Sequence, residues 1–175
     1  MIVELRELKP SDSQALASIA NNKKIADNLT DSFPFPYTLW DAERFIDLCK
    51  RRKDEEITRT IVVDQQLAGM ISVLPKTDVH RKTAELGYWL AQEHWNKGIT
   101  SQAVRLICKQ AFETYDIVRI YAKVFAFNEA SCRVLEKSGF VFEALLKNDV
   151  IKNDQIIDLR LYALVLPQRI KATKK

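Results

Sequence analysis

Glycine, cysteine and histidine are all scarce in this 175-residue chain, which has four glycines, three cysteines and two histidines. The cysteines, Cys49, Cys108 and Cys132, lie far apart and form no Cys-x-x-Cys pair, so we expect neither a disulfide framework nor a zinc site. No stretch approaches the roughly 18 apolar residues that a membrane-spanning helix needs. Residues 1–8 carry charges where a signal peptide would be apolar. These absences predict a cytoplasmic protein without a metal centre or a membrane anchor.

The charge of the chain is nearly balanced, with a net charge of +4. A small positive excess suits an anionic small ligand or a nucleic acid and proves neither. The sequence has no RNA-binding motif and no stripe of interleaved basic and aromatic residues, so a nucleic-acid-binding or ribosome-binding module is a distant alternative. A length of 175 residues suits one domain. We expect that domain over residues 1–166, followed by a basic tail over residues 167–175.

Hydrophobic periodicity predicts an α+β fold. Apolar residues recur at helical spacing over residues 99–115, whereas residues 57–63 are rich in β-branched side chains. The expected strands cover residues 2–8, 57–63, 67–74, 83–90, 118–125, 140–146 and 156–164. The expected helices begin near residue 11, where a short helical or irregular stretch follows to about residue 28, and at residue 38, and cover residues 99–115 and 128–137. Hairpin strands in the middle of the chain and helices between the later strands imply a mixed sheet.

Polar residues mark where several of these helices begin. Ser11 with Gln14, and Thr38 with Asp41, have the spacing of capping boxes. Asn128 stands where it can cap the helix over residues 128–137. The sequence therefore predicts three helix starts from local signals alone.

Each of the four glycines has a structural interpretation, and two of them also have a functional one. Gly69 lies in a strand, where it allows close packing, and Gly139 terminates a helix. Gly87 interrupts a strand and indicates a bulge or the close approach of another backbone or a ligand. Gly98 lies between the end of a strand and the start of a helix, where free backbone N–H groups and the helix dipole favour an anion. A glycine there lets a phosphate approach the backbone without a Cβ in its path.

The order of these segments is typical of one enzyme family. A glycine-bearing strand leads into Trp95–Ala103 and an amphipathic helix, and a later strand leads into a second helix that Asn128 caps. In this order the chain resembles the ribosomal-protein-alanine (RimJ/RimL) type of the GCN5-related N-acetyltransferase (GNAT) superfamily. The resemblance runs from the first strand to Tyr162. Its most specific pieces are Glu85–Leu90, Trp95–Ala103, Asn128-x-x-Ser131 and Lys137-x-Gly139-Phe140.

The resemblance implies the GNAT fold, which is a mixed, mostly antiparallel central sheet of about seven strands flanked by helices. It implies a splayed gap between the fourth and fifth strands, where a bulge near Gly87 parts the two strands. The pantetheine arm of CoA lies in that gap, and a backbone N–H polarises the thioester carbonyl. It also implies acetyl-CoA as the cosubstrate, no metal, and direct attack by an acceptor amine.

The pyrophosphate-binding signature of the family is Gln/Arg-x-x-Gly-x-Gly/Ala. Here it reads Trp95-Asn96-Lys97-Gly98-Ile99-Thr100. Thr100 replaces a smaller residue, and its side chain either crowds the phosphate or hydrogen-bonds to it. The residues expected to bind acetyl-CoA are Tyr88, Trp89, Leu90, Asn96, Lys97, Gly98, Ile99, Thr100, Ser101, Asn128 and Lys137.

The same resemblance suggests two catalytic side chains. Ser131 matches a serine proposed in this subgroup to protonate the departing thiolate, and its alternative is a role in the helix cap alone. Many relatives use a tyrosine for this step at the position that holds Leu135 here. Glu85 is the candidate general base, directly or through water, or else it only binds the amine. Cys132 is expected to be a small buried residue rather than a nucleophile. The expected walls of the acceptor site, unless they are ordinary core aromatics, are Phe35, Tyr37 and Tyr88.

The sequence leaves two classes of acceptor open. The first is a protein N-terminal α-amine, as in ribosomal-protein acetyltransferases. The second is a small molecule such as a polyamine, an amino sugar or an antibiotic. A polycation would need an acidic pocket, and the sequence has no dense acidic cluster, which favours the protein acceptor. A CoA-binding protein without turnover and a homodimer also remain open.

Overall fold

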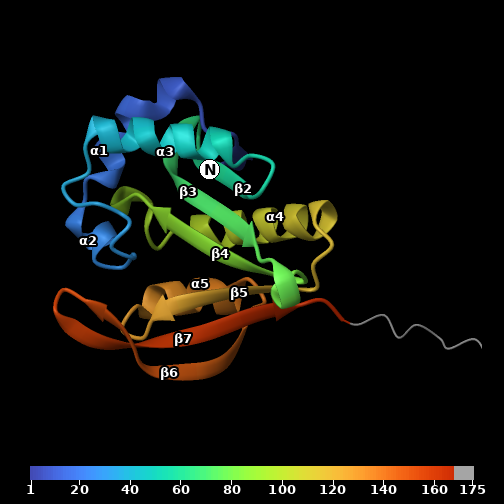
Figure 1. Ribbon diagram of the computed structural model, residues 1–175. Coiled ribbons are helices and arrows are strands. Elements are labelled where there is room, and N and C mark those ends of the chain that lie inside the picture. Colours follow the sequence, from blue (N-terminus) through green and yellow to red (C-terminus); the bar gives the residue numbers. More distant parts are fainter. Residues whose placement is uncertain (168–175) are drawn as a thin grey trace, which may run out of the picture.

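The computed structural model describes residues 1–167, which form one mixed sheet with helices on both faces (Figure 1). The sheet has seven strands in the order β1-β2-β3-β4-β5-β7-β6. Every neighbouring pair is antiparallel except β4 with β5, which is parallel. The strands are β1 Val3–Arg6, β2 Ile57–Val63, β3 Gln66–Pro75, β4 Thr83–Leu90, β5 Arg119–Phe125, β6 Val141–Lys152 and β7 Gln155–Val165. The predicted α+β fold with a mixed sheet is confirmed.

The helices follow the predicted order, and the stretch up to residue 28, expected to be helical or irregular, contains a second short helix. The α-helices are α1 Ser13–Ala20, α2 Lys23–Ala26, α3 Leu39–Arg51, α4 Ile99–Thr114 and α5 Glu129–Lys137, and short 3-10 turns cover Pro10–Asp12, Asp78–His80 and Gln92–His94. Within residues 1–167, no helix is both long enough and apolar enough to cross a membrane. The predicted basic tail over residues 167–175 lies, from residue 168 on, outside the described part of the chain.

The predicted β2–β3 hairpin is confirmed, and the last two strands are longer than predicted. The hairpin turns at Asp64 and Gln65, whose φ angles of 47° and 69° are both left-handed, as a two-residue hairpin turn requires. Strand β6 extends to Lys152 instead of ending at residue 146. Its register with β7 shifts around Asn148, which has a φ angle of 54°. This irregularity breaks the alternation on which a strand prediction depends.

Two of the predicted helix caps form as expected. The N–H of Thr38 donates to Oδ2 of Asp41 at 2.8 Å, and the N–H of Asp41 donates to Oγ1 of Thr38 at 3.3 Å. These two bonds are the reciprocal pair of a capping box at the start of α3. Asn128 caps α5, and Gly139 follows that helix with a φ angle of 89°, which suits a glycine that ends a helix.

The capping box predicted for Ser11 and Gln14 is wrong, because Asp12 caps this region instead. Residues 10–12 form a 3-10 turn, and Oδ2 of Asp12 accepts the N–H of Lys9 at 2.7 Å. The same carboxylate accepts two bonds from the guanidinium of Arg6 on β1, at 2.7 and 2.8 Å. Burial acts to raise the pKa of Asp12, but the bonds from Arg6 and Lys9 outweigh it and hold that pKa below its usual value. A local spacing rule could not reveal the partner on β1.

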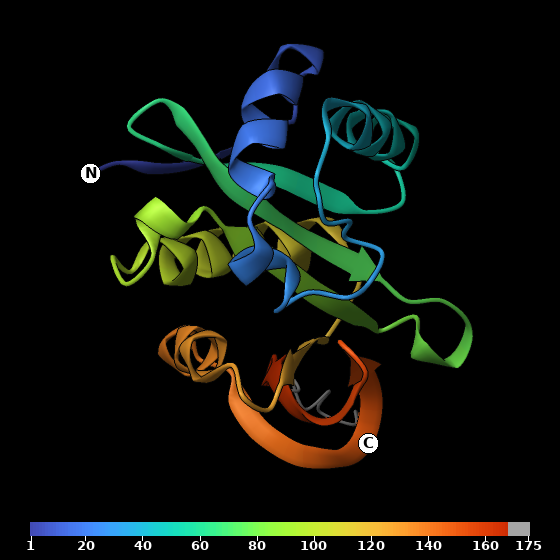
Figure 2. The same cartoon turned by 90° about the vertical axis from the view of Figure 1, so that its left-hand side faces the viewer.

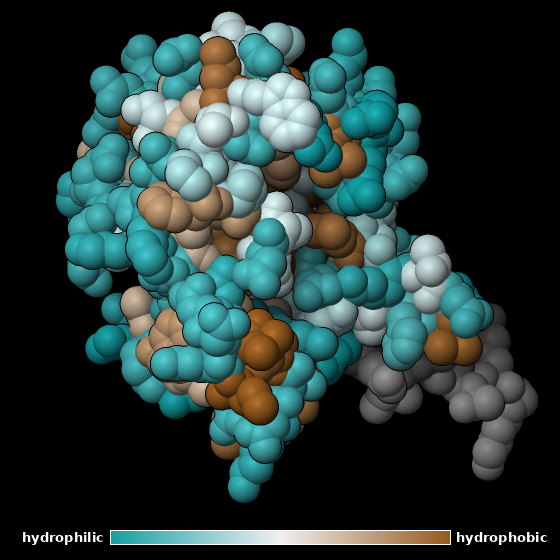
Figure 3. Space-filling view, turned by 60° about the vertical axis from the view of Figure 1, so that its left-hand side comes forward, coloured by the Kyte–Doolittle hydropathy of each residue, from teal (hydrophilic) through white to brown (hydrophobic). Residues whose placement is uncertain are grey.

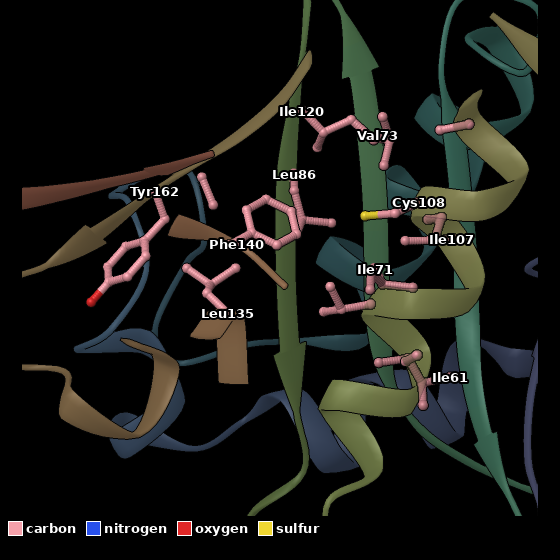
Figure 4. Close-up of a cluster of buried hydrophobic side chains, with 14 of the residues drawn as sticks. Ile61, Ile71, Val73, Leu86, Ile107, Cys108, Ile120, Leu135, Phe140 and Tyr162 are labelled. Carbon is pink, nitrogen blue, oxygen red and sulfur yellow. The ribbon is translucent and has the colours of Figure 1, made fainter. Parts of the chain in front are cut away.

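Each face of the sheet has its own hydrophobic core. Neighbouring residues of a strand point to opposite faces. Ile71 of β3 and Leu86 of β4 pack against Ile107 on the side of α4 and α5, as Figure 4 shows. Met70 points the other way and packs with α1, α3 and Tyr37. Along β4, the same alternation directs one set of side chains toward α5 and the other toward α1–α3.

Strands β4 and β5 part after a short stretch of pairing. Thr83–Glu85 pairs with Arg119–Tyr121, and among the described residues the parallel ladder has no further rungs. Figure 2 shows β1–β4 above the resulting gap and β5–β7 below it. The predicted splay between the fourth and fifth strands is therefore confirmed. It leaves backbone groups of both strands without a strand partner.

The predicted bulge at Gly87 is wrong. Gly87 pairs with Ser72 in a β3–β4 register that runs without a shift, and the register shift on this side of the sheet lies between β2 and β3, where the ladder skips Ala68. The close packing predicted for Gly69 is confirmed, because a Cβ there would lie 2.3 Å from the carbonyl oxygen of Trp89. Strand β4 thus separates from β5 without a bulge toward β3. The approach of a ligand to Gly87 stays a prediction.

Candidate active site

A cleft of about 920 Å³ opens where β4 and β5 separate. Its walls come from α2 and the loop after it, from β4, from the loop and first turn of α4, from β5 and from α5. All the residues predicted to bind acetyl-CoA line this cleft, and so do Ser131 and Glu85. The fold therefore collects these predicted site residues in one place. The space-filling view of this side shows a largely polar surface with small apolar patches (Figure 3).

The start of α4 forms one end of the cleft. Gly98 is the N-cap of this helix and has a φ angle of 74°, and Asn96 just before it has a φ angle of 59°. The first N–H groups of a helix have no partner within it, and the helix dipole adds partial positive charge. No atom lies within 4 Å of the place that a Cβ on Gly98 would take. Glycine adopts this left-handed backbone without strain, and the open space in front of it suits an anion.

Trp95 fixes this loop to the end of β4. Its indole Nε1 donates to the carbonyl oxygen of Leu90 at 2.8 Å. Trp89 also lines the cleft, and its ring meets Phe33 edge-on with a centroid distance of 5.6 Å. Because both tryptophans are held by neighbours, the turn from β4 into α4 has a defined shape.

The first turn of α5 brings two hydroxyl groups together in the cleft. Asn128 caps the helix through Oδ1, which accepts the N–H of Ser131 at 3.1 Å. The Oγ of Ser131 lies 2.7 Å from Oη of Tyr88 on β4. Burial raises the pKa of Tyr88, although its bond to Ser131 opposes the rise. Cys132 is almost fully buried, which confirms the prediction that it is a small core residue.

Glu85 lies where the β4–β5 pairing ends, and its carboxylate has two partners. Nζ of Lys76 donates to Oε2 of Glu85 at 2.5 Å, and Oη of Tyr121 donates to the same oxygen at 3.1 Å. Burial acts to lower the pKa of Lys76, but the bond to Glu85 outweighs it and the pKa is raised. The carboxylate is partly exposed in the cleft, so a water molecule can reach it.

Phe35 and Tyr37, which we expected to form walls of the acceptor site, are not among the residues that line the cleft. Tyr37 is buried in the core beneath α1 and α3, and its ring centroid lies 5.0 Å from that of Phe33. Phe35 is 49% exposed at the surface. Of the three predicted wall residues, Tyr88 alone lies in the cleft.

The segment from α2 to residue 30, which is not among the expected wall residues, lines the cleft instead. The residues that it contributes to the cleft are Lys24, Ile25, Asn28, Leu29 and Thr30. This stretch has no clear period, since α2 spans Lys23–Ala26 alone. The one local signal is Asn22, whose side chain accepts the N–H of Lys24 at 2.9 Å and so caps α2.

The tip of the β6–β7 hairpin reaches this segment from the far end of the chain. Nζ of Lys152 pairs with Oδ1 of Asp31 at 2.8 Å, and Nδ2 of Asn153 donates to Oδ1 of Asp27 at 3.0 Å. The Lys152 side chain is 8% exposed, whereas that of Asp31 is 80% exposed. The bridge joins residues that lie 121 positions apart in sequence. No pattern in the sequence could have predicted this contact.

The cleft carries more positive than negative side chains. Five cationic and two acidic residues line it, namely Lys24, Lys97, Lys123, Arg133 and Lys137 against Glu85 and Glu129. Glu129 is itself paired with Arg160 at 2.8 Å. A positive surplus in a cleft attracts polyanions such as the phosphates of CoA. No group of three or more metal-ligating residues occurs in residues 1–167.

Comparisons with known proteins agree with this geometry. The pattern of the acetyltransferase (GNAT) domain matches residues 3–141. The putative ribosomal N-acetyltransferase YdaF of Bacillus subtilis is 30% identical over 93% of this chain and 91% of its own. The ribosomal-protein-serine acetyltransferase of Escherichia coli is 33% identical over 61% of this chain, and the match spans 59% of that enzyme. The spermidine N(1)-acetyltransferase of Vibrio cholerae is 27% identical over 91% of each chain.

A solved structure has the same fold. The RimL ribosomal L7/L12 alpha-N-protein acetyltransferase in complex with coenzyme A superposes with a TM-score of 0.83 and covers 94% of each chain at 23% identity. Its likeness establishes the arrangement of the strands and helices described above. The domain pattern matches residues 3–141, and the splayed sheet and the glycine-capped α4 agree with it. This chain therefore belongs to the GNAT family of acetyl-CoA-dependent N-acetyltransferases.

Proposed function

We propose that this protein transfers the acetyl group of acetyl-CoA to the α-amine of a protein N-terminus by direct attack. The observation that carries the proposal is the continuous cleft, which runs from the start of α4 through the β4–β5 gap to the α2 segment. Such a cleft can hold CoA at one end and a slender amine at the other. The likeness to enzymes named for ribosomal proteins supports the choice of acceptor.

The coenzyme end uses backbone groups more than side chains. The N–H groups after Gly98 face the pyrophosphate, and the cationic side chains of Lys97 and Lys137 add charge. Beyond Glu85, β4 has no ladder to β5 in the described chain, so its free backbone groups pair with the pantetheine arm. A backbone N–H near Gly87 then donates to the oxygen of the thioester as negative charge develops there.

The chemistry needs a neutral amine, a place for its proton and a proton for the departing thiolate. Glu85 takes the amine proton, directly or through water, and Ser131 supplies a proton to the sulfur. A carboxylate is a weak base. That suits an α-amine, whose ordinary pKa is about 7.7–8.0, better than a lysine or polyamine amine near 10.4.

The charge of the cleft also separates the two classes of acceptor. A polyamine carries several positive charges and needs carboxylates around it. Here five cationic side chains line the cleft, and Glu85 is already paired with Lys76. A small-molecule acceptor is the second candidate, because the relative named as a spermidine acetyltransferase aligns over 91% of this chain.

A turnover assay with matched acceptors tests the proposal. Release of CoA from acetyl-CoA is measured with a peptide that has a free N-terminus, with the same peptide blocked at the N-terminus but carrying lysine, and with spermidine and an aminoglycoside. We expect the highest kcat/KM with the free N-terminus. A higher value with spermidine or the aminoglycoside would contradict the protein acceptor, and CoA binding without turnover of any amine would contradict the enzyme itself.

A further inference from the structure

A tyrosine hydroxyl reaches the proposed proton donor from another part of the fold. Tyr88 lies on β4, and its Oη is 2.7 Å from Oγ of Ser131 on α5, 43 positions away in sequence. Both residues line the cleft. In the proposed function the backbone of β4 pairs with the pantetheine arm, and the phenol of Tyr88 has no role.

The fold fixes both members of this hydroxyl pair. Alternation along β4 directs Tyr88 to the same face as Leu86 and Leu90, where its ring packs against the core beneath α4 and α5. A packed ring on one side and a capped helix on the other hold the two oxygens in place.

The phenol is the better hydrogen-bond donor of the two. A serine hydroxyl has one hydrogen to donate and two lone pairs that accept, and a phenol, with an ordinary pKa of about 10, is the more acidic group. Burial raises the pKa of Tyr88, so the phenol keeps its hydrogen at neutral pH. When Oη of Tyr88 donates to Oγ of Ser131, the hydrogen of Ser131 is free to point toward another acceptor. Without that bond the hydroxyl of Ser131 can rotate among its staggered positions.

We infer that Tyr88 is a positioning residue that aims the hydroxyl of Ser131 at the departing sulfur. The inference rests on the role proposed for Ser131. In this step the C–S bond breaks, its electron pair stays on sulfur, and the hydroxyl hydrogen of Ser131 moves to the sulfur. The proton that the attacking nitrogen loses passes from Glu85 through water to the oxygen of Ser131 as that hydroxyl gives up its own hydrogen, so no free alkoxide forms. Tyr88 keeps its hydrogen and its bond to the Ser131 oxygen throughout.

A double-mutant cycle tests this inference. The kcat and the KM for acetyl-CoA are measured for the wild type, Tyr88→Phe, Ser131→Ala and the double variant, with whichever amine the wild type acetylates fastest. A residue that acts only through Ser131 loses its effect when Ser131 is removed. We expect Tyr88→Phe alone to lower kcat about threefold to tenfold, to leave the KM within about twofold, and to cause no further loss in the Ser131→Ala background.

Tyr162→Phe is the matched control. Tyr162 is also buried, and its Oη also bonds to α5, where it donates to Oε1 of Glu136 at 3.0 Å, but it does not line the cleft. We expect Tyr162→Phe to shift the Tm about as much as Tyr88→Phe and to leave kcat unchanged. The inference is overturned if Tyr88→Phe has the wild-type kcat, or lowers kcat by the same factor with and without Ser131. This test can use any amine that the wild type acetylates. If that amine belongs to another acceptor class, the proposed function is refuted, but the test of Tyr88 stays valid.

Discussion

The two ends of the cleft are built in opposite ways. Most of the residues proposed to bind acetyl-CoA lie within residues 90–101, a continuous stretch in which Trp95 bonds back to Leu90 and Gly98 caps α4. The proposed acceptor end is lined by the α2 segment up to Thr30 and by Glu85, and the hairpin tip at residues 152–153 bonds to that segment without lining the cleft. There Lys152 meets Asp31 across 121 positions of sequence. A binding site made from one short segment can be recognised in a sequence, whereas a site assembled from remote segments becomes visible only in the folded molecule.

The difference has a physical origin. Phosphate recognition by a helix start depends on backbone N–H groups and one left-handed residue, which a few neighbouring residues determine. Recognition of an acceptor depends on which side chains face it, and therefore on how separate elements pack. Changes at one end should therefore alter the affinity for acetyl-CoA, and changes at the other should alter the affinity for the acceptor.

The largest expected effect lies between the two ends, at Ser131. Ser131→Ala should lower kcat about tenfold to a hundredfold and leave both binding parameters nearly unchanged, because general acid catalysis acts in the transition state. The cap of α5 survives, since it uses the backbone N–H of Ser131 and not its hydroxyl. Steady-state kinetics with a melting curve checks this. A normal kcat would remove Ser131 from the mechanism, and a raised KM for acetyl-CoA with normal kcat would make it a binding residue.

The next effect should be confined to the coenzyme end. Gly98→Ala places a Cβ in the open space before α4 and strains a backbone with a φ angle of 74°, which costs about 1–2 kcal/mol. We expect the Kd for acetyl-CoA, measured by calorimetry, to rise about tenfold, while the acceptor KM stays constant.

Gly139→Ala is the control for that backbone strain. Gly139 is also left-handed, with a φ angle of 89°, and it does not line the cleft. We expect a similar fall in Tm and no change in the Kd for acetyl-CoA. Equal Kd values for the Gly98 variant and the wild type would refute the phosphate site at the start of α4.

The pH profile of the acceptor end should show a somewhat smaller effect. The neutral amine attacks, so the rate rises as pH rises through the pKa of the acceptor and then levels off. For an α-amine with a pKa of about 7.7–8.0, kcat/KM should rise about sevenfold between pH 7 and pH 9 and level off above pH 8. For an amine near 10.4 the rise over this interval would approach about a hundredfold. A rate that still climbs steeply past pH 9 would count against a protein N-terminus.

The smallest effect is expected at the hairpin tip. Lys152→Met removes the bridge to Asp31 and keeps an apolar side chain in a buried place. We expect the acceptor KM to rise about threefold through looser positioning of the α2 segment, with an unchanged Kd for acetyl-CoA. An unchanged acceptor KM would show that the tip takes no part in acceptor binding.

Asp31→Asn gives the matched comparison at the same bridge. It should raise the acceptor KM to a similar extent, because it breaks the same ion pair. It should lower the Tm more than Lys152→Met does, because it leaves the buried ammonium without its charged partner. Equal Tm values for the two variants would contradict that account of the bridge.

The order of the elements could be predicted from the sequence, and so could much of the coenzyme end. Alternation and helical spacing predicted all seven strands and helix α4, because these patterns repeat within a few residues. Thr38, Asn128 and Gly98 could be interpreted from their neighbours alone, since a cap or a left-handed turn is a local structure. The residues expected around CoA came from the family resemblance, and the fold brings them into one cleft.

Tertiary structure alone decided the rest. It placed Tyr37 in a core and the α2 segment in the cleft, because burial depends on which elements pack together. It paired Asp12, just before α1, with Arg6 on β1, and it parted β4 from β5 without the predicted bulge. It also joined the hydroxyl of Tyr88 to Ser131 across 43 positions. Contacts between remote residues leave no period and no spacing in a single sequence, so physical reasoning along the chain cannot recover them.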